Sequence, residues 1–196
     1  PLYNMGCTVY SFEPNAHCAS LLASWASRKS NVHFFQVGLS DVSETAELKI
    51  PLDETGKQHI ASASVCKEFE GQFSIEEITL SRLDNFELPG LSFLKIDVEG
   101  LEDKVIRGGL ETIRKYRPVL LIEIEERHRS TSVNVLFSVL YEMGYKAFMA
   151  TQYGFKEVLA SDVEDMSKLQ ALELSKNFWF VRGQANELSM TVSGRS

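Results

Sequence analysis

Acidic residues follow three apolar segments of this sequence, at positions where they could bind a ligand or move a proton. In "KIDVEGLED", Asp97 and Glu99 are two residues apart, so an extended backbone directs both carboxylates to the same side. Two carboxylates crowded together repel each other unless a cationic group lies beside them. Asp97 and Glu99 are therefore candidates for a general base or for contact with a positively charged ligand.

The other polar residues near this pair have simpler explanations. Gly100 lacks a Cβ, which suits a tight turn or the close approach of a ligand. Glu102 and Asp103 fall in the first turn of a predicted helix, where acids are favourable whatever the function. In "LLIEIEE", Glu123 alternates with two isoleucines and is expected to point into a crevice or a polar layer. Glu125 equally suits a solvated end of the strand.

Two further acids come earlier in the chain. In "TVYSFEPN", Glu13 ends an apolar segment, where an acid in a nucleotide-binding fold accepts hydrogen bonds from two ribose hydroxyls. Alternatively, Glu13 only stabilises the N-terminus of the next helix through its dipole. In "VGLSD", Asp41 could accept a hydrogen bond from the exocyclic amine of an adenine, or could be a turn residue beside Ser40 and Ser43. Taken alone, each acid fits its structural interpretation at least as well as its functional one.

These acids need a scaffold of strands that brings their ends together. Apolar, β-branched and aromatic runs predict buried strands at residues 8–12, 31–41, 91–100 and 119–126. Strand, helix and strand at this spacing predict βαβ units and hence an α/β fold with a parallel sheet. Ligands bind beyond the carboxyl ends of parallel strands, so Glu13, Asp41 and Asp97 are expected to share one cleft.

Apolar residues at helical period predict the helices between these strands. The helix after Asn15, its expected N-cap, has an apolar stripe of Leu21, Leu22, Trp25 and Ala26. A helix from Leu101 is expected to break at Gly108 and Gly109. In "TSVNVLFSVLYEMG" the residues expected to face the core are Val133, Leu136, Phe137 and Leu140.

The rest of the chain is expected to add to one domain over residues 1–183. Residues 42–90 predict a β-rich excursion with strands in "TAELKI" and "QFSIEEITLSRL". "YKAFMAT" and "NFWFVRG" predict late strands, the second after a short helical piece near residues 163–174. Residues 184–196 are expected to form a disordered tail.

Composition excludes several classes of function. Of the 196 residues, 44% are hydrophobic and 24% charged, as in soluble globular proteins, and no apolar run is long enough to span a bilayer. The net charge of −7 argues against a nucleic-acid surface, which needs clustered Lys and Arg. Three widely spaced cysteines favour a reducing, cytoplasmic location, and the spacing of the cysteines and histidines predicts no metal site.

The order of these motifs resembles that of the FkbM-type S-adenosylmethionine-dependent methyltransferases. The resemblance rests on "VYSFEPN", "VGLSD", "LKIDVEGLEDKVIRGG", "RPVLLIEIE" and "NFWFV", and it extends from about Thr8 to Val181. It implies a Rossmann-like class I methyltransferase sheet, mostly parallel, and S-adenosylmethionine as cofactor. The reaction implied is methyl transfer to a hydroxyl oxygen of a sugar or small metabolite.

The resemblance also implies roles for individual residues. Glu13 would hold the cofactor ribose, with Pro14 and Asn15 shaping that wall. Ser40 and Asp41 would lie near the adenine. Residues of the later motifs would serve the reaction, namely Asp97 at the methionine portion and reaction centre, Glu99 near the acceptor, and Glu123 as a further candidate base.

One feature of the family pattern is missing. That pattern begins with a strand and a glycine-rich turn that cradle the carboxypropyl end of the cofactor, and no Gly-x-Gly precedes Glu13. The chain is therefore expected to be a fragment of a longer protein, or a degenerate, non-catalytic methyltransferase-like binding module.

Two other rivals are a nicotinamide-dependent dehydrogenase and a metal-dependent hydrolase that uses Asp97, Glu99 and Glu123 as oxygen ligands. The dehydrogenase ranks low, since the sequence has no Tyr-Lys or His signature for it. The stretch from Asp53 to Phe73 is expected to be a surface loop, or else to shape the acceptor pocket through its polar residues Gln58, His59, Ser62 and Ser64.

Overall fold

The computed structural model describes residues 2–65, 71–124, 133–163 and 176–182. The chain folds as two compact units. The first unit comprises Pro1–Leu88 and Lys104–Leu110, and the second comprises Pro89–Asp103 and Glu111–Ser196.

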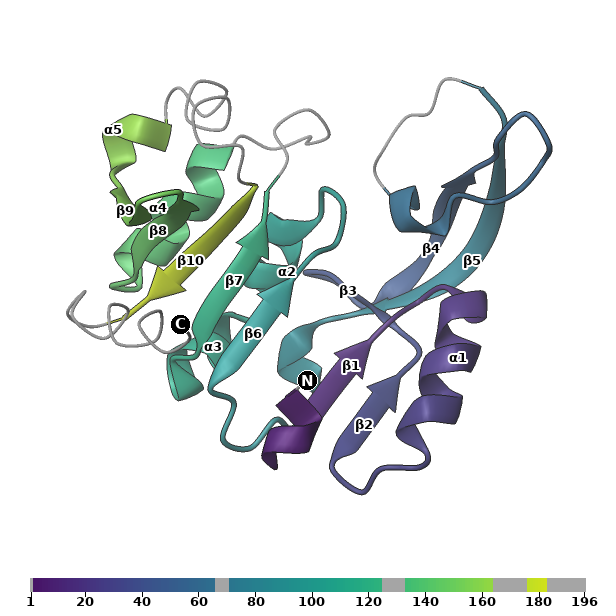
Figure 1. Cartoon of the computed structure of the whole chain (residues 1–196), viewed down its shortest axis with the longest axis horizontal. Coiled ribbons are helices and arrows are strands. Elements are labelled where there is room, and N and C mark those ends of the chain that lie inside the picture. Colours follow the sequence, from purple (N-terminus) through teal and green to yellow (C-terminus); the bar gives the residue numbers. More distant parts are fainter. Residues whose placement is uncertain (1, 66–70, 125–132, 164–175, 183–196) are drawn as a thin grey trace. The chain divides into compact units, whose positions relative to one another are not determined.

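The first unit contains a parallel strand pair, the helix that connects it, a three-stranded sheet and, from its second segment, most of α2 (Glu102–Gly108) (Figure 1). Its elements are η1 (Leu2–Met5), β1 (Val9–Phe12), α1 (Ala16–Ala26), β2 (Val32–Phe35), β3 (Gly38–Leu39), β4 (Glu44–Pro51), η2 (Ile60–Ser62), β5 (Phe73–Ser81) and η3 (Leu83–Asn85).

The predicted βαβ unit is confirmed at the start of the chain. Strands β1 and β2 are parallel, from Val9 opposite Val32 to Phe12 opposite Phe35, and α1 connects them. The single strand predicted over residues 31–41 is wrong, because the chain leaves β2 at Phe35 and resumes as β3. Strand β3 pairs in parallel with β5 and so belongs to the three-stranded sheet, in the order β3-β5-β4.

Helix α1 buries the predicted stripe except for Leu21. Ala19 and Ala26 are buried and Leu22 and Trp25 are partly buried, whereas Leu21 is 62% exposed. The inward stripe therefore follows positions 19, 22 and 26, which are three and four residues apart as a helical face requires. Leu21 lies outside it, on the solvent side.

Strands β4 and β5 form the predicted β-rich excursion as a long antiparallel hairpin. They pair from Glu44 opposite Leu80 to Pro51 opposite Phe73. One face of the hairpin is apolar, and its buried residues are Leu48, Ile50, Ile78 and Leu80. Partly buried Ile60 from η2 packs against this cluster and covers it. Strand β4 forms one edge of the three-stranded sheet.

The second unit is built on a five-stranded sheet in the order β6-β7-β10-β8-β9 (Figure 1). The remaining elements of the chain are β6 (Phe93–Ile96), α2 (Glu102–Gly108), α3 (Leu110–Tyr116), β7 (Val119–Glu123), α4 (Val133–Glu142), β8 (Lys146–Thr151), β9 (Gly154–Val158), α5 (Ala160–Val163) and β10 (Asn177–Val181). The predicted helical piece at residues 163–174 and the predicted tail at 184–196 lie largely or wholly outside the described residues.

The α/β class is confirmed, but the mostly parallel sheet is not. Strands β6 and β7 are parallel, whereas β10 is antiparallel to both β7 and β8, and β8 is antiparallel to β9. Strand β9, which the sequence analysis missed, returns directly from β8 as a hairpin. The sheet of the second unit is therefore mixed.

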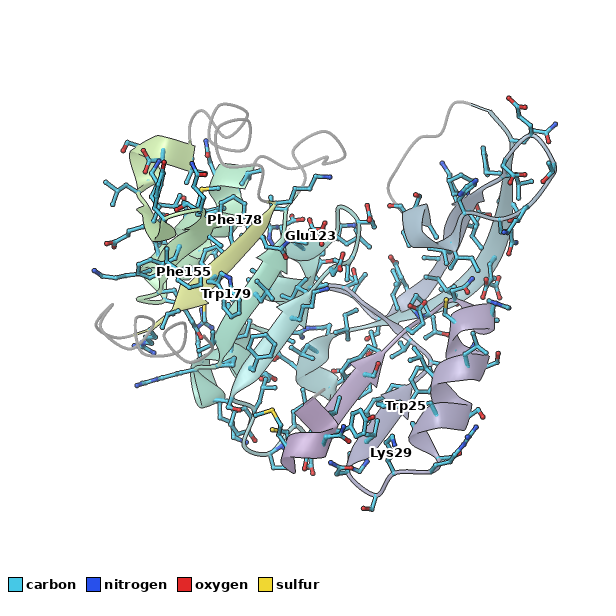
Figure 2. The ribbon with its side chains drawn as sticks, in the orientation of Figure 1. Trp25, Lys29, Glu123, Phe155, Phe178 and Trp179 are labelled. Atoms are coloured by element: carbon cyan, nitrogen blue, oxygen red, sulfur yellow. The ribbon has the colours of Figure 1, made fainter. Side chains whose placement is uncertain are left out.

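One face of this sheet forms the core of the second unit. Val133, Leu136, Phe137 and Leu140 of α4 are all buried, as predicted. The Phe137 ring contacts the rings of Phe178 and Phe180 on β10. Because side chains alternate along a strand, Trp179 lies on the opposite face of the sheet. There the centroid of its ring lies 6.0 Å from that of the Phe155 ring (Figure 2).

In the part of the chain that the structure describes, no helix is both long and apolar enough to cross a membrane.

Candidate functional site

Glu13 follows β1 directly, at the carboxyl end of the strand. Its backbone N–H donates to the Phe35 carbonyl at 3.2 Å, which extends the β1–β2 pairing by one residue. Its side-chain Oε1 accepts a hydrogen bond from the Asn15 N–H at 2.8 Å, whereas Oε2 has no partner among the described residues. The carboxylate is partly buried and keeps one oxygen available for a ligand.

The surroundings of Glu13 raise its pKa above the usual value. Partial burial is the largest cause, because it disfavours the charged form. The Asn15 N–H opposes this effect, and the nearby Glu76 carboxylate adds to it by like-charge repulsion. Burial also raises the pKa of the Cys18 thiol, and Glu13 and Glu76 raise it further.

The residues after Glu13 form the entry to α1. Asn15 is only 2% exposed and acts as the predicted N-cap, with its Oδ1 accepting from the Cys18 N–H at 3.0 Å. Pro14 packs over β3, since a Cβ built on Gly38 would lie 3.5 Å from its ring. The cap of α1 is thus supplied by Asn15, so Glu13 is not required for it.

Ser40 and Asp41 lie just past β3, in the same unit as Glu13. Ser40 is 1% exposed, its N–H donates to the Ser81 carbonyl at 2.9 Å, and its hydroxyl donates to Asp41 Oδ1 at 3.3 Å. Asp41 lies in the bend between β3 and β4, which fits its alternative interpretation as a turn residue, and its side chain accepts no backbone N–H among the described residues.

Gly108 explains how α2 approaches this segment. A Cβ at position 108 would lie 1.9 Å from the Ser40 carbonyl oxygen and 3.2 Å from the Asp41 Cα. Only a residue without a side chain allows this contact. The predicted helix end at Gly108 is confirmed, and the glycine has the additional role of letting α2 pack directly on the backbone of Ser40.

In the second unit, Asp97 and Glu123 follow neighbouring parallel strands. Lys95 on β6 lies opposite Leu121 on β7. Asp97 comes two residues after Lys95, and Glu123 comes two residues after Leu121. Their side chains therefore lie on one face at the carboxyl ends of the strands. Figure 2 shows Glu123 at this end of β7.

Asp97 and Glu123 differ in their surroundings. Asp97 is 39% exposed and forms an ion pair with Lys95, whose Nζ lies 2.7 Å from Oδ2. Lys95 thus places a cationic group beside Asp97. Glu123 is partly buried, and its carboxylate has no hydrogen-bond or ion-pair partner among the described residues. Asp97 is thus held in place, whereas the Glu123 carboxylate is available.

Glu99 does not lie where an extended backbone would place it. Its φ is +52° and that of Gly100 is +106°, so two successive residues adopt left-handed conformations. The prediction that Asp97 and Glu99 project to the same side of an extended segment is therefore wrong. The turn is held from α2, because the buried Glu102 side chain accepts the Gly100 N–H at 2.8 Å. The structural interpretation of Glu102 is confirmed.

The candidate residues form two groups. Glu13, Pro14, Asn15, Ser40 and Asp41 lie in the first unit, and Asp97, Glu99 and Glu123 lie in the second. Glu13, Pro14 and Asn15 follow β1, and Ser40 and Asp41 follow β3, whereas Asp97 and Glu123 lie at the ends of the paired strands β6 and β7. The prediction that Glu13, Asp41 and Asp97 share one cleft stays a prediction.

The polar residues proposed for an acceptor pocket are mostly engaged in the hairpin. Gln58 Nε2 donates to the Ser74 hydroxyl at 2.9 Å, and buried Ser64 exchanges two backbone hydrogen bonds with Lys49. Ser62 is exposed, and His59 lies 3.9 Å from Asp53. These contacts support the interpretation of a surface loop. No three His, Cys, Asp or Glu side chains are grouped as metal ligands in the part of the chain that the structure describes.

Two residues of these sites were not found from the sequence. Lys95 could have been found, because "LKID" places it two residues before Asp97 on a strand. Glu76 could not have been found from the sequence, because it contacts the N-terminus of α1 from a strand some sixty positions later in the chain.

The comparison with protein families agrees with the resemblance. The family profile of the Methyltransferase FkbM domain matches residues 2–147. A crystal structure of a methyltransferase FkbM from Methylobacillus flagellatus KT is similar, with 16% identity and a TM-score of 0.48 over 87% of this chain. This chain spans only 36% of that protein. No curated protein sequence matches. Because the family profile covers most of its length, the chain belongs to the FkbM methyltransferase domain family.

Proposed function

We propose that this chain is part of an S-adenosylmethionine-dependent methyltransferase that methylates a hydroxyl oxygen of a sugar or small metabolite. Membership of the family supports methyl transfer. The observation that supports this cofactor is the Glu13 carboxylate, which lies at the carboxyl end of β1 with one oxygen unshared among the described residues.

The residues of the first unit fit the nucleoside part of this cofactor. Glu13 would accept hydrogen bonds from the two ribose hydroxyls, and bonds to a charged acceptor contribute about 1.5–3 kcal/mol each. Pro14 and Asn15 would form the wall beside the ribose. Asp41, which Ser40 holds through a hydrogen bond of 3.3 Å, would accept the exocyclic amine of the adenine.

The acids of the second unit fit the chemical step. S-adenosylmethionine, when bound, supplies a methyl group on a positively charged sulfur. A hydroxyl acceptor must lose its proton, and a placed base typically speeds such a step about 10²–10⁴-fold. Asp97 would accept this proton while Lys95 fixes its orientation, with Glu99 near the acceptor and Glu123 as a second candidate base.

Positioning would contribute most of the acceleration. Alignment of two reacting groups can supply up to about 7–11 kcal/mol of a barrier. Asp97 follows β6, which pairs with β7 at one edge of the five-stranded sheet, and its side chain forms an ion pair with Lys95. Glu102 holds the turn after Asp97 by accepting the Gly100 N–H. Both contacts would help to hold Asp97 in one position, as such alignment requires.

Calorimetry of the full-length protein with S-adenosylhomocysteine tests the cofactor. Saturable binding is expected, and NADH and magnesium chloride serve as controls. Binding of NADH alone would favour the dehydrogenase, and binding of magnesium alone would favour the hydrolase. Binding of S-adenosylhomocysteine without methyl transfer to any hydroxyl acceptor would favour a non-catalytic module.

A further inference from the structure

Glu76 joins the β4–β5 hairpin to the start of α1. Its Oε1 accepts the Ala16 N–H at 2.6 Å, and its Oε2 accepts from Asn15 Nδ2 at 2.7 Å. Ala16 is the first residue of α1 and Asn15 is its N-cap. One carboxylate therefore binds two consecutive residues of the segment that follows Glu13.

Asn15 connects Glu76 to Glu13 through hydrogen bonds. Its backbone N–H donates to Glu13 Oε1 at 2.8 Å, its Oδ1 accepts from the Cys18 N–H, and its carbonyl accepts from the Ala19 N–H at 2.8 Å. Asn15 is 2% exposed and uses its polar groups in these bonds and in the one to Glu76. A shift of the Asn15 side chain would therefore move the N–H that orients the Glu13 carboxylate.

The backbone of β5 positions the Glu76 side chain. It lies opposite Leu48 in the β4–β5 ladder, on the same side of β5 as the buried residues Ile78 and Leu80. Strand β4 pairs with β5 along its length, and β3 pairs with the other edge of β5 at Leu80 and Ser81. The Glu76 side chain thus extends from a backbone that the β4–β5 ladder holds.

Helix capping alone does not account for this arrangement. Asn15 already caps α1, and a second acid beside Glu13 adds repulsion between two carboxylates, which raises the pKa of Glu13. A neutral residue would avoid that repulsion. The geometry is explained if the turn that carries Glu13 must be held in one conformation.

We propose that Glu76 is a positioning residue of the cofactor site, and that it orients the Glu13 carboxylate toward the ribose through Asn15. This inference rests on the proposed function. Glu76 itself touches no reacting group and acts only through the turn.

The test compares Glu76→Gln with Glu77→Gln in the full-length protein. A glutamine at position 76 can accept one of the two hydrogen bonds but must present an N–H to the other donor. Glu77 has the same charge on the same strand, but its side chain is exposed and lies opposite Glu47. Calorimetry with S-adenosylhomocysteine should show affinity about tenfold lower for Glu76→Gln. Glu77→Gln should bind within about twofold of the wild type.

A second measurement separates positioning from general destabilisation. Binding requires ionised Glu13, so affinity should fall as the pH drops through the raised pKa of Glu13. Without the Glu76 charge, this fall should occur at a lower pH in Glu76→Gln, which a loss of folding would not produce. Glu76→Asp keeps the charge but shortens the reach, and it should lower affinity without that shift.

The outcomes are distinct. Equal affinities for wild type, Glu76→Gln and Glu76→Asp would overturn the inference and leave the proposed function intact. A wild type that does not bind S-adenosylhomocysteine would overturn the proposed function, and the inference with it. In Asn15→Ala, the further substitution Glu76→Gln should change affinity by less than twofold, because Glu76 acts through Asn15.

Discussion

At the scale of residues, Glu13 combines two opposing demands. Its carboxylate must be ionised to accept ribose hydroxyls, yet partial burial and the charge of Glu76 raise its pKa. A raised pKa means that the folded state binds a proton more readily than the unfolded chain. Glu13 therefore lowers the stability of the fold above this pKa, and that loss is relieved as the pH falls below it.

Glu13→Gln should consequently weaken binding and strengthen the fold. The glutamine can still accept the Asn15 N–H, but it carries no charge for the ribose. We expect affinity for S-adenosylhomocysteine to fall about tenfold or more at neutral pH, and the melting temperature to rise. The affinity of the variant should also be independent of pH in the window where the wild type loses binding. A lower melting temperature together with unchanged affinity would refute this account.

The second prediction at this scale concerns proton transfer. Asp97→Asn retains the size of the side chain and removes the carboxylate, and Glu99→Gln does the same at the adjacent turn. At least one of them should lower kcat by tenfold or more, within the range of about 10²–10⁴ for a lost base. Glu142→Gln, an exposed change on α4, is the control. If both variants turn over at wild-type rate in a methyl-transfer assay, neither acid is the base.

At the scale of elements, contacts between backbones decide how the candidate residues are held. The end of α2 packs on Ser40 with no space for a side chain at position 108. Alanine is otherwise favoured over glycine in a helix by about 1 kcal/mol, so Gly108→Ala would be stabilising if nothing touched it. We expect it instead to destabilise the protein by about 1–3 kcal/mol, because overpacking must displace the Ser40 carbonyl.

Urea unfolding measures this effect, with Arg107→Ala as the matched control. Arg107 is the exposed neighbour of Gly108 on the same helix. The control should change stability by less than about 0.5 kcal/mol. A Gly108→Ala protein as stable as the control would show that α2 and the Ser40 segment do not touch in solution.

Elements with strong periodicity could be predicted from the sequence, and contacts between distant segments could not. The four inward residues of α4 are buried as predicted, since an amphipathic helix has only one apolar face. Leu21 was misplaced because α1 has apolar residues on several sides, and packing chooses among them. Glu99 was misplaced because nothing in "DVEG" distinguishes an extended residue from a left-handed one before glycine.

The direction of the late strands could not be predicted from the sequence either. "YKAFMAT" and "NFWFVRG" were placed as strands, but an apolar run pairs equally well in either direction, so the mixed sheet could not be predicted. Strand β9 was missed because Lys156 and Glu157 make it polar, as is typical of an edge strand. Of the site, the strand-end acids could be found, whereas Glu76 required the fold.

At the scale of the whole molecule, charge should govern ligand preference. The net charge of −7 and the strand-end carboxylates favour a cation. S-adenosylmethionine carries a positive sulfonium that S-adenosylhomocysteine lacks. We therefore expect the ratio of their affinities to shift toward S-adenosylhomocysteine as salt is raised, because screening shortens the Debye length to about 3 Å at 1 M. Calorimetry of both ligands at low and high salt measures this, and a constant ratio would contradict it.

The two tryptophans of the chain fall one in each compact unit, which gives the protein a built-in pair of optical reporters (Figure 2). Trp25 lies edge-on to Tyr3 with the Lys29 ammonium 5.4 Å from its ring, whereas the Trp179 ring contacts the rings of Phe93 and Phe155. Their emission should differ in wavelength and quenching, since one indole has a cation beside it and the other has two phenyl rings. Replacing either one with phenylalanine would leave a fluorescence signal that follows a single unit through ligand titration or denaturation.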